Sequence, residues 1–316
     1  ARTITSPMSS SCSCLLVSPS HAAAAAVACL SSSAWHVVAV LLDGDVSAAP
    51  SVHGVLRVLA LSQQLASVSD SPQVRLITCG VVATDGGGLS ANGGAWGFAR
   101  VLRLEHVALR TQSIDVSRGH GRGAAAVAFA FVSMSTLEAE AAWSGSTHAA
   151  ARLRARRLSL TLRAPLALGA YVVTGGLGGL GLRAAALLLE GGAPHVLLAS
   201  RSGRVVRDGQ GLDAQLGSMG TAAGVLACDS AEQLDAAALL FGRLLTGVLH
   251  AAGVGDAGLL IELDTHRMQW MYASKATGAW YLQHVAATDP LEKRVLFSSV
   301  GSGLGNVGQA NYAAGN

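Results

Sequence analysis

The chain has 316 residues and a net charge of +3, and 51% of its residues are hydrophobic while only 13% are charged. It is long enough for two domains of ordinary size. Alanine supplies much of the apolar content, which does not by itself indicate a membrane protein. No run reaches the roughly 18 apolar residues that span a bilayer. The one dense basic cluster, residues 152–157, alternates with apolar residues, which favours a strand with one solvated face over a nucleic-acid site.

Five cysteines lie at irregular spacing along the chain. An odd, irregular set indicates neither a disulfide framework nor a zinc site, so we expect no metal. Free thiols fit a reducing compartment, which favours a cytoplasmic location, and a plastid is also compatible.

The first half begins with a serine- and alanine-rich stretch, residues 1–33, which is predicted to be a linker or a disordered lead-in. Apolar runs and helical spacings then alternate. They predict strands at 35–42, 73–82, 113–116 and 157–162, and helices at 51–67 and 96–106. This alternation predicts a parallel α/β subdomain over residues 34–165. The sequence of this subdomain shows no phosphate loop and no clustered catalytic residues.

The second half, residues 166–316, repeats this architecture. Its expected strands are 171–174, 195–200, 225–227, 245–250 and 294–299, with helices between them. The fold class is therefore α/β, with two Rossmann-like parallel-sheet subdomains, of which the first is degenerate and structural. No sixth or seventh strand follows before Asn316, so we expect the second subdomain to be truncated at its C-terminus.

A glycine-rich loop joins the strand 171–174 to an Ala/Leu-rich helix former at 182–190. The loop residues are Thr174, Gly175, Gly176, Leu177, Gly178, Gly179, Leu180 and Gly181. Glycines allow a tight turn and a close approach of backbone to a pyrophosphate, and the helix N-terminus offers N–H groups to it. Strand, glycine turn and helix in this order predict a dinucleotide site.

The residues after the second strand discriminate between NAD and NADP. No carboxylate stands there to bind a ribose 2′-hydroxyl; the chain has Ser200, Arg201 and Ser202. A guanidinium pairs with a 2′-phosphate, so the cofactor is predicted to be NADPH, the alternative being a solvated turn arginine. Asp229, after Cys228 at the end of the third strand, either accepts a hydrogen bond from the adenine amino group or caps the next helix.

Four further residues together fit the reduction of a carbonyl by hydride: Lys275, Ser299, Tyr312 and Asn316. Each alone has a simpler explanation as a solvated charge, a turn, a core side chain or a surface amide. A phenol with a pKa near ~10 needs a nearby ammonium to act as an acid at neutral pH. A serine hydroxyl can hold the carbonyl oxygen, and an amide four residues after the tyrosine shares its helix face and can position a water.

These residues resemble the ketoreductase domains of modular polyketide synthases and animal-type fatty acid synthases, within the short-chain dehydrogenase/reductase superfamily. Ordinary superfamily members carry lysine four residues after the tyrosine. Here Asn316 takes that place and Lys275 lies upstream, an exchange typical of the synthase ketoreductases. The other matching segments are 174–181, 200–201, 228–229, 250–253, 297–299 and 308–316. Residues 94–106 are similar to a helix of the cofactor-free structural subdomain that precedes the catalytic one in that family.

The resemblance implies NADPH-dependent reduction of a β-ketoacyl chain that an acyl carrier protein holds through phosphopantetheine, beside neighbouring synthase domains, with no nucleic acid and no membrane span. It implies that Tyr312 donates the proton and Ser299 orients the carbonyl. Lys275 would lower the pKa of the tyrosine and contact the nicotinamide ribose, and Asn316 would support the proton relay. Further cofactor contacts are implied at His250, Ala251, Ala252 and Gly253.

The chain departs from the family at two positions that mark product configuration. In the turn 254–257, Val-Gly-Asp-Ala, many members carry Leu-Asp-Asp at the last three positions. Asp256 is retained here, whereas Gly255 and Ala257 replace the leucine and the second aspartate. Leu304 stands where a tryptophan marks the opposite configuration. The stereochemistry and the acyl substrate are therefore undetermined.

Two alternatives remain. One is a non-catalytic scaffold or remnant of a synthase, and the other is a free-standing dehydrogenase acting on a small alcohol. The intact catalytic set counts against the first, and the first-half subdomain and the moved lysine count against the second.

Overall fold

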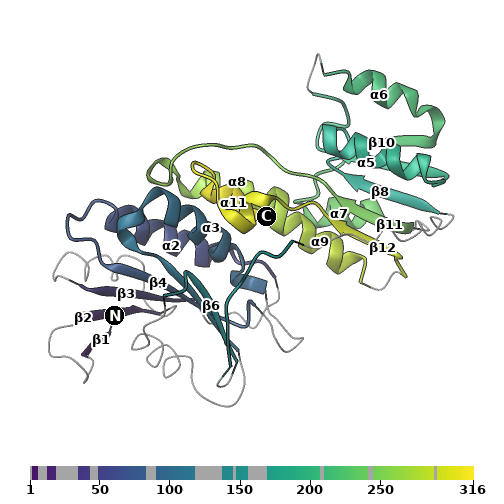
Figure 1. Cartoon of the computed structure of the whole chain (residues 1–316). Helices are drawn as coiled ribbons and strands as arrows, with labels where there is room; N and C mark the ends of the chain where they lie inside the picture. Colours follow the sequence, from purple (N-terminus) through teal and green to yellow (C-terminus); the bar gives the residue numbers. More distant parts are fainter. Residues whose placement is uncertain are drawn as a thin grey trace. The chain divides into compact units, whose positions relative to one another are not determined.

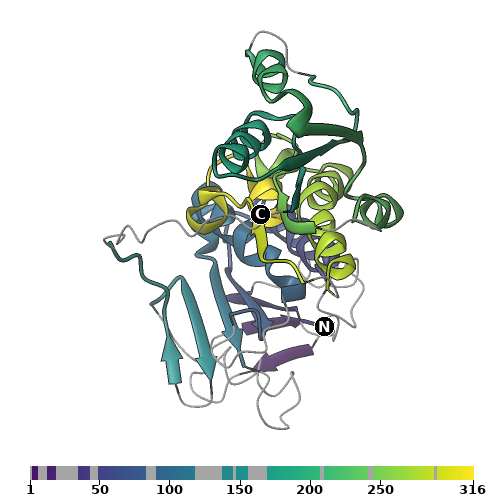
Figure 2. The ribbon, with the colours of Figure 1, turned by 90° about the vertical axis from the view of Figure 1, so that its right-hand side faces the viewer.

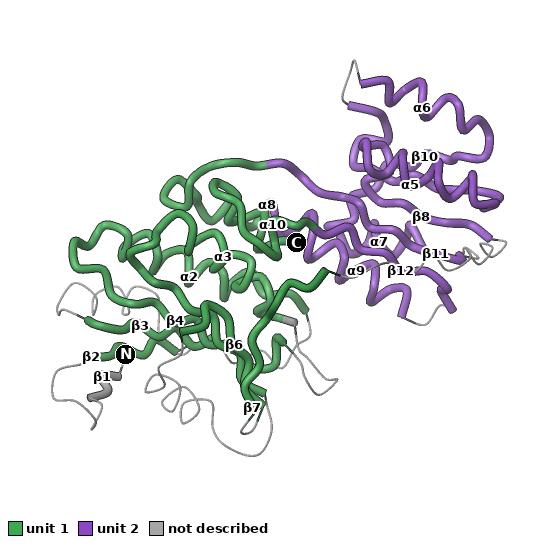
Figure 3. The backbone as a smooth tube through the Cα atoms, in the orientation of Figure 1, with its two compact units in different colours: residues 1–155, 256–269, 299–316 green, residues 156–255, 270–298 purple. Residues whose placement is uncertain are grey.

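The computed structural model describes residues 2–5, 13–18, 35–42, 49–82, 90–117, 137–144, 147–155, 169–206, 210–240, 245–287 and 290–316. They form two sheets with their helices (Figures 1 and 2). The chain divides into two compact units, shown in different colours in Figure 3. Unit 1 comprises Ala1–Ala155, Asp256–Gln269 and Ser299–Asn316, and unit 2 comprises Arg156–Gly255 and Trp270–Ser298.

The sheet of unit 2 has, among the described residues, five parallel strands in the order β10-β9-β8-β11-β12. Their bounds are β8 (Ala170–Thr174), β9 (His195–Ser200), β10 (Ala223–Ala227), β11 (Leu245–His250) and β12 (Lys293–Leu296). The strand order reverses between β8 and β11. In open sheets of this kind a ligand binds outside the carboxyl ends of the strands at such a reversal, and the glycine-rich loop follows β8 at that point.

Helices cover both faces of this sheet because alternate residues of β8 point to opposite sides. Tyr171 and Val173 pack with Leu182 of one helix layer, and Val172 packs with Leu239 of the other. The helices are α5 (Gly179–Glu190), α6 (Leu212–Ser218), α7 (Gln233–Leu240) and α9 (Gly278–Val285), with the 3-10 turn η3 (Gly220–Ala222). Helix α8 (Thr265–Tyr272) leads into the π-helical turn η5 (Ala273–Thr277). The parallel α/β prediction is confirmed.

The sheet of unit 1 has seven described strands, which lie side by side in chain order, with β2 to β6 parallel and the outermost two pairings antiparallel. Their bounds are β1 (Arg2–Thr5), β2 (Ser13–Val17), β3 (Val37–Leu42), β4 (Gln73–Cys79), β5 (Gln112–Val116), β6 (Glu140–Ser144) and β7 (Thr147–Ala149). The helical elements between them are α2 (Val52–Leu65), η1 (Ser90–Asn92), α3 (Gly94–Glu105) and η2 (Val107–Leu109).

The prediction that residues 1–33 are a linker or a disordered lead-in is wrong for β1 and β2. Strand β2 pairs in parallel with β3, and Leu15 is 1% exposed. A short apolar run inside a serine-rich stretch joins the sheet because a neighbouring strand satisfies its backbone. Strands β6 and β7 were also not predicted, whereas the predicted strand 157–162 and the proposed boundary at residue 165 lie outside the described residues.

Two segments from the second half of the chain belong to unit 1. They carry η4 (Leu260–Glu262), α10 (Val300–Leu304) and α11 (Ala310–Gly315). Helices α10 and α11 pack on α3, which Figure 1 shows beside α2. At Gly97 of α3 the approach is very close, because a Cβ there would lie 2.0 Å from the carbonyl oxygen of Ala313.

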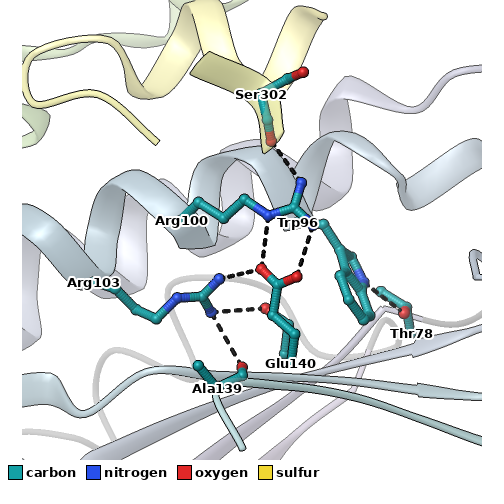
Figure 4. A network of polar contacts seen from close by, with 8 residues as sticks. Thr78, Trp96, Arg100, Arg103, Ala139, Glu140 and Ser302 are labelled. Carbon is teal, nitrogen blue, oxygen red and sulfur yellow. Dashed lines mark hydrogen bonds and ion pairs between the residues drawn. The ribbon is translucent and has the colours of Figure 1, made fainter. Parts of the chain in front are cut away.

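An arginine of α3 also joins the sheet of unit 1 to α10 (Figure 4). Arg100 donates to both carboxylate oxygens of Glu140, each at 2.7 Å, and to the carbonyl oxygen of Ser302 at 2.5 Å. Arg103 pairs with the same carboxylate. One carboxylate thus fixes two arginines, and one of them holds the backbone of α10.

Among the residues that the structure describes, no helix is long and apolar enough to cross a membrane.

We predict that Gly97→Ala lowers the free energy of unfolding by about 1–3 kcal/mol, because the added methyl group forces α3 and α11 apart. Thermal and denaturant unfolding measure this change. The control is Gly217→Ala in α6, where a Cβ meets nothing within 4 Å. It should leave stability unchanged or raise it by about 0.5–1 kcal/mol. Equal responses of the two variants would contradict the close packing at Gly97.

Candidate active site

The glycine-rich loop after β8 is held by contacts that leave no room for side chains at three positions. Gly175 has a φ of +67°, and a Cβ there would lie 2.5 Å from the backbone nitrogen of Ala252. A Cβ at Gly176 would lie 2.6 Å from the carbonyl oxygen of Val173, and one at Gly181 would lie 2.3 Å from that of Gly175. These glycines are therefore required by the packing of the loop itself.

The loop leaves the N-terminus of α5 open. A Cβ at Gly179 would meet nothing within 4 Å, and Gly178 is an extended N-cap without a side-chain hydrogen bond. Leu177 is 4% exposed and anchors the loop in the core, whereas Leu180 is 67% exposed. The first N–H groups of a helix lack intrahelical acceptors, so this end of α5 can bind the phosphates of a dinucleotide.

A buried hydroxyl and an exposed guanidinium follow at the end of β9. Ser200 Oγ is buried and has no hydrogen-bond partner among the described residues. Arg201 is exposed, and Ser202 Oγ donates to the carbonyl oxygen of Arg204 at 3.0 Å. The buried hydroxyl lacks a protein partner and the turn holds no carboxylate, so these residues fit a ligand with anionic oxygens.

Cys228 and Asp229 have structural contacts at the end of β10. Burial raises the pKa of the Cys228 thiol to about 11, so it is protonated at neutral pH. Asp229 Oδ1 accepts from the backbone nitrogen of Ala231 at 3.0 Å, and its own nitrogen donates to Asp235 Oδ2 at 3.0 Å. Asp229 thus caps the turn before α7, and its contact with adenine stays a prediction.

His250, at the end of β11, ties three elements of unit 2 together. It is 3% exposed, its Nδ1 lies 2.7 Å from Thr174 Oγ1, and its Nε2 lies 3.1 Å from the carbonyl oxygen of Lys275. Burial lowers the pKa of His250 to about 4, so the ring is neutral at pH 7. A carbonyl oxygen only accepts hydrogen bonds, so Nε2 carries the proton and Nδ1 accepts from the threonine hydroxyl.

Lys275 lies in the π-helical turn η5, a type of irregularity that is frequent at functional sites. Its Nζ donates to the carbonyl oxygen of Phe297 at 3.3 Å, and burial lowers its pKa. A Cβ at Gly253 would lie 2.4 Å from the Lys275 Cε. The glycine of the turn after β11 therefore makes room for this lysine, a contact that the sequence did not reveal.

The other three predicted catalytic residues lie in unit 1. Ser299 was expected to end the fifth strand, but β12 ends at Leu296 and Ser299 is the N-cap of α10, where its Oγ accepts from Gly301 N at 3.1 Å. The hydroxyl satisfies a helix N–H that would otherwise lack an acceptor. Tyr312 lies in α11 and Asn316 is the C-cap of that helix, where Asn316 Nδ2 donates to the Tyr312 carbonyl oxygen at 2.8 Å.

The structure thus brings the predicted residues together in two groups. Unit 2 holds the glycine-rich loop, the residues after β9 and β10, His250 and Lys275, and unit 1 holds Ser299, Tyr312 and Asn316. The pairing of Lys275 with Tyr312 stays a prediction.

Sequence reasoning missed a polar cluster beside Tyr312. Arg267 donates to the two carboxylate oxygens of Asp256 at 2.7 and 2.9 Å, and Asn311 Nδ2 donates to the same carboxylate at 2.6 Å. Asn311 Oδ1 in turn accepts from the backbone nitrogen of Tyr312 at 2.8 Å. The hydrogen bond and charge of Arg267 hold the pKa of Asp256 below its usual value. The retained aspartate of the 254–257 turn was the only signal for this cluster.

Residues 169–316 match the family model of the KR domain. These residues belong to the KR domain family. The resemblance to synthase ketoreductases is thereby confirmed, and the second half of the chain has the fold of a reductase of the short-chain dehydrogenase/reductase type. This fold implies a nicotinamide cofactor.

The related proteins are polyketide synthases. The chain is 42% identical over 153 residues to polyketide synthase GfsA of Streptomyces halstedii. The aligned region covers 47% of this chain and 2% of GfsA. It is 41% identical over 164 residues to erythronolide synthase EryA2 of Saccharopolyspora erythraea, covering 51% of this chain and 5% of EryA2. A match to polyketide synthase GfsB of Streptomyces halstedii, at 34% identity, covers 87% of this chain and 5% of GfsB. The chain thus spans a small part of each synthase.

Solved ketoreductases share this fold. A structure of A-type ketoreductases from a modular polyketide synthase has a TM-score of 0.76 and 32% identity, over 93% of this chain and 66% of that chain. A C2-type ketoreductase from a modular polyketide synthase has a TM-score of 0.76 and 28% identity, over 93% of this chain and 67% of that chain. Two types match equally well, so backbone similarity does not identify the type of this domain.

We predict that His250 makes the stability of the protein fall as the pH is lowered from about 6.5 to about 4. The pKa is lower in the folded than in the unfolded state, so the unfolded chain binds the extra proton first, and the stabilisation present above pH 6.5 is lost. Melting temperature measured against pH should fall less steeply for His250→Gln than for the unmodified protein. Equal slopes would contradict the prediction.

Proposed function

We propose that this domain is an NADPH-dependent β-ketoacyl reductase, which reduces the β-keto group of an acyl chain on an acyl carrier protein to a β-hydroxyacyl thioester. The observation that carries the proposal is the arrangement on α11 of a KR-family chain. Tyr312 lies in α11 and Asn316 caps the C-terminal end of that helix, where its side-chain amide donates to the carbonyl oxygen of Tyr312.

When bound, a reduced nicotinamide would supply the hydride for the β-carbon. The Tyr312 hydroxyl donates a proton to the carbonyl oxygen, and the Ser299 hydroxyl holds that oxygen by a hydrogen bond. The Lys275 ammonium stabilises the phenolate that proton transfer leaves behind. Asn316 positions the water that returns a proton to the tyrosine.

The surroundings of Lys275 support this role. Lys275 is buried, with 9% of its surface exposed, and its Nζ donates to the carbonyl oxygen of Phe297 at 3.3 Å. Charge–charge interactions strengthen as the surroundings become less polar. A buried ammonium is therefore suited to stabilising the negative charge of a phenolate.

The choice of NADPH over NADH rests on the turn after β9. Ser200 Oγ is buried without a partner among the described residues, and Arg201 follows with an exposed guanidinium. The two together offer a hydroxyl and a charged fork to a 2′-phosphate. The acyl carrier protein and neighbouring synthase domains are proposed as partners because the related proteins are polyketide synthases.

We expect Tyr312→Phe to lower the rate of NADPH oxidation with a β-ketoacyl thioester by about 100-fold or more, because the proton donor is lost. The dissociation constant for NADPH should stay the same. Tyr281→Phe, which removes a hydroxyl from α9, is the matched control and should keep full turnover. Undiminished turnover of Tyr312→Phe would contradict the proposal that Tyr312 is the proton donor of a reductase.

We expect Arg201→Ala to raise the dissociation constant for NADPH about 10- to 100-fold and to leave that for NADH unchanged, because a charge-assisted contact to the 2′-phosphate is lost. Fluorescence titration of both cofactors measures the difference. Arg154→Ala, which removes an exposed arginine of unit 1, serves as the control. An equal rise of the dissociation constants for NADPH and NADH would show that Arg201 does not contact the 2′-phosphate.

A further inference from the structure

Glu105, the last residue of α3, reaches two distant segments of the chain. Its Oε2 accepts from the backbone nitrogen of Leu260 at 2.6 Å, and its Oε1 accepts from that of Gly308 at 2.8 Å. The two donors lie 155 and 203 residues further along the chain. Glu105 lies in the first half of the chain, where no site residue is predicted. Both segments lie in the second half, which carries all the predicted site residues.

The two segments are also joined to each other, close to Tyr312. Gly258 N donates to the carbonyl oxygen of Gly308 at 2.9 Å. Gly308 has a φ of +76°, a left-handed conformation that favours glycine, and α11 begins two residues later. Gly308 is thus fixed through both its N–H and its carbonyl group, four residues before Tyr312.

A second side chain of the first half holds the same segment from the opposite side. Gln63 Nε2, on α2, donates to the carbonyl oxygens of Leu260 and Leu263, at 3.0 and 2.7 Å. Leu260 itself is fully buried. Its N–H is therefore bound by Glu105 and its carbonyl group by Gln63, and the segment serves as a fixed point for the Gly308 turn.

A glutamate at position 105 is well suited to binding two backbone N–H groups, although its charge is unfavourable at the end of α3. A carboxylate at the C-terminal end of a helix faces the negative end of the helix dipole, which disfavours it. An ionised carboxylate has two acceptor oxygens, however, and its hydrogen bonds to backbone N–H groups are roughly twice as strong as neutral ones. A glutamine would present its amide NH₂ to one of the two N–H donors and lose that bond.

We propose that Glu105 is a positioning residue for Tyr312. It acts through backbone rather than on substrate, because it sets the Gly308 turn, and with it the start of α11, against the segment at Leu260. This inference rests on the proposed function, in which Tyr312 donates the proton.

The test compares Glu105→Gln with Glu190→Gln, which changes an exposed glutamate of α5. Glu105→Gln should lower kcat for a β-ketoacyl thioester about 10-fold or more. It should leave the dissociation constant for NADPH unchanged, because the predicted cofactor residues lie in unit 2. Glu190→Gln should keep both values. The milder Glu105→Asp, which keeps the charge and shortens the reach, should show a smaller loss confined to kcat.

A double variant separates positioning from general destabilisation. In a Tyr312→Phe background, Glu105→Gln should lower the residual rate no further, because its effect passes through the tyrosine. An unchanged kcat for Glu105→Gln, a weakened affinity for NADPH, or an equal loss in both backgrounds would overturn the inference. Undiminished turnover of Tyr312→Phe alone would instead overturn the proposed function, so the two failures are distinguishable.

Discussion

Helix α11 lies so close to α3 that a methyl group at Gly97 would come within 2.0 Å of a carbonyl oxygen of α11. Two further residues of α3 hold the same region of unit 1, since Arg100 binds the backbone of α10 and Glu105 binds the turn before α11. One helix therefore supports the backbone on both sides of Tyr312. Helix α3 can in this way determine where the side chain of Tyr312, the proposed proton donor, lies.

The division into units does not follow the two halves of the sequence. The chain leaves unit 2 after Gly255 and after Ser298, and each time it enters a segment that packs in unit 1. Unit 2 keeps the glycine-rich loop and the buried residues His250 and Lys275. The residues predicted to bind cofactor thus belong to unit 2, whereas Ser299, Tyr312 and Asn316 belong to unit 1.

Local patterns predicted much of the fold. The strands of the second sheet and the helices α2 and α3 were predicted because apolar residues recur at strand or helix spacing over whole elements. The prediction failed at β1, β2, β6 and β7, which are all short strands. Strands β2 and β6 pair with β3 and β5, which are separated from them along the chain, and such a neighbour leaves no local signal.

The sequence by itself determined the α/β class, the glycine-rich loop and the set of chemistry-bearing residues, because each of these depends on residue type and short spacing. Only the tertiary structure decided that Asp256 is bound by Arg267 and Asn311, and that Glu105 bridges two loops. It also decided that Gly97 must lack a side chain and that Gly253 makes room for Lys275. These are contacts between residues far apart in the chain, and only packing in three dimensions specifies them.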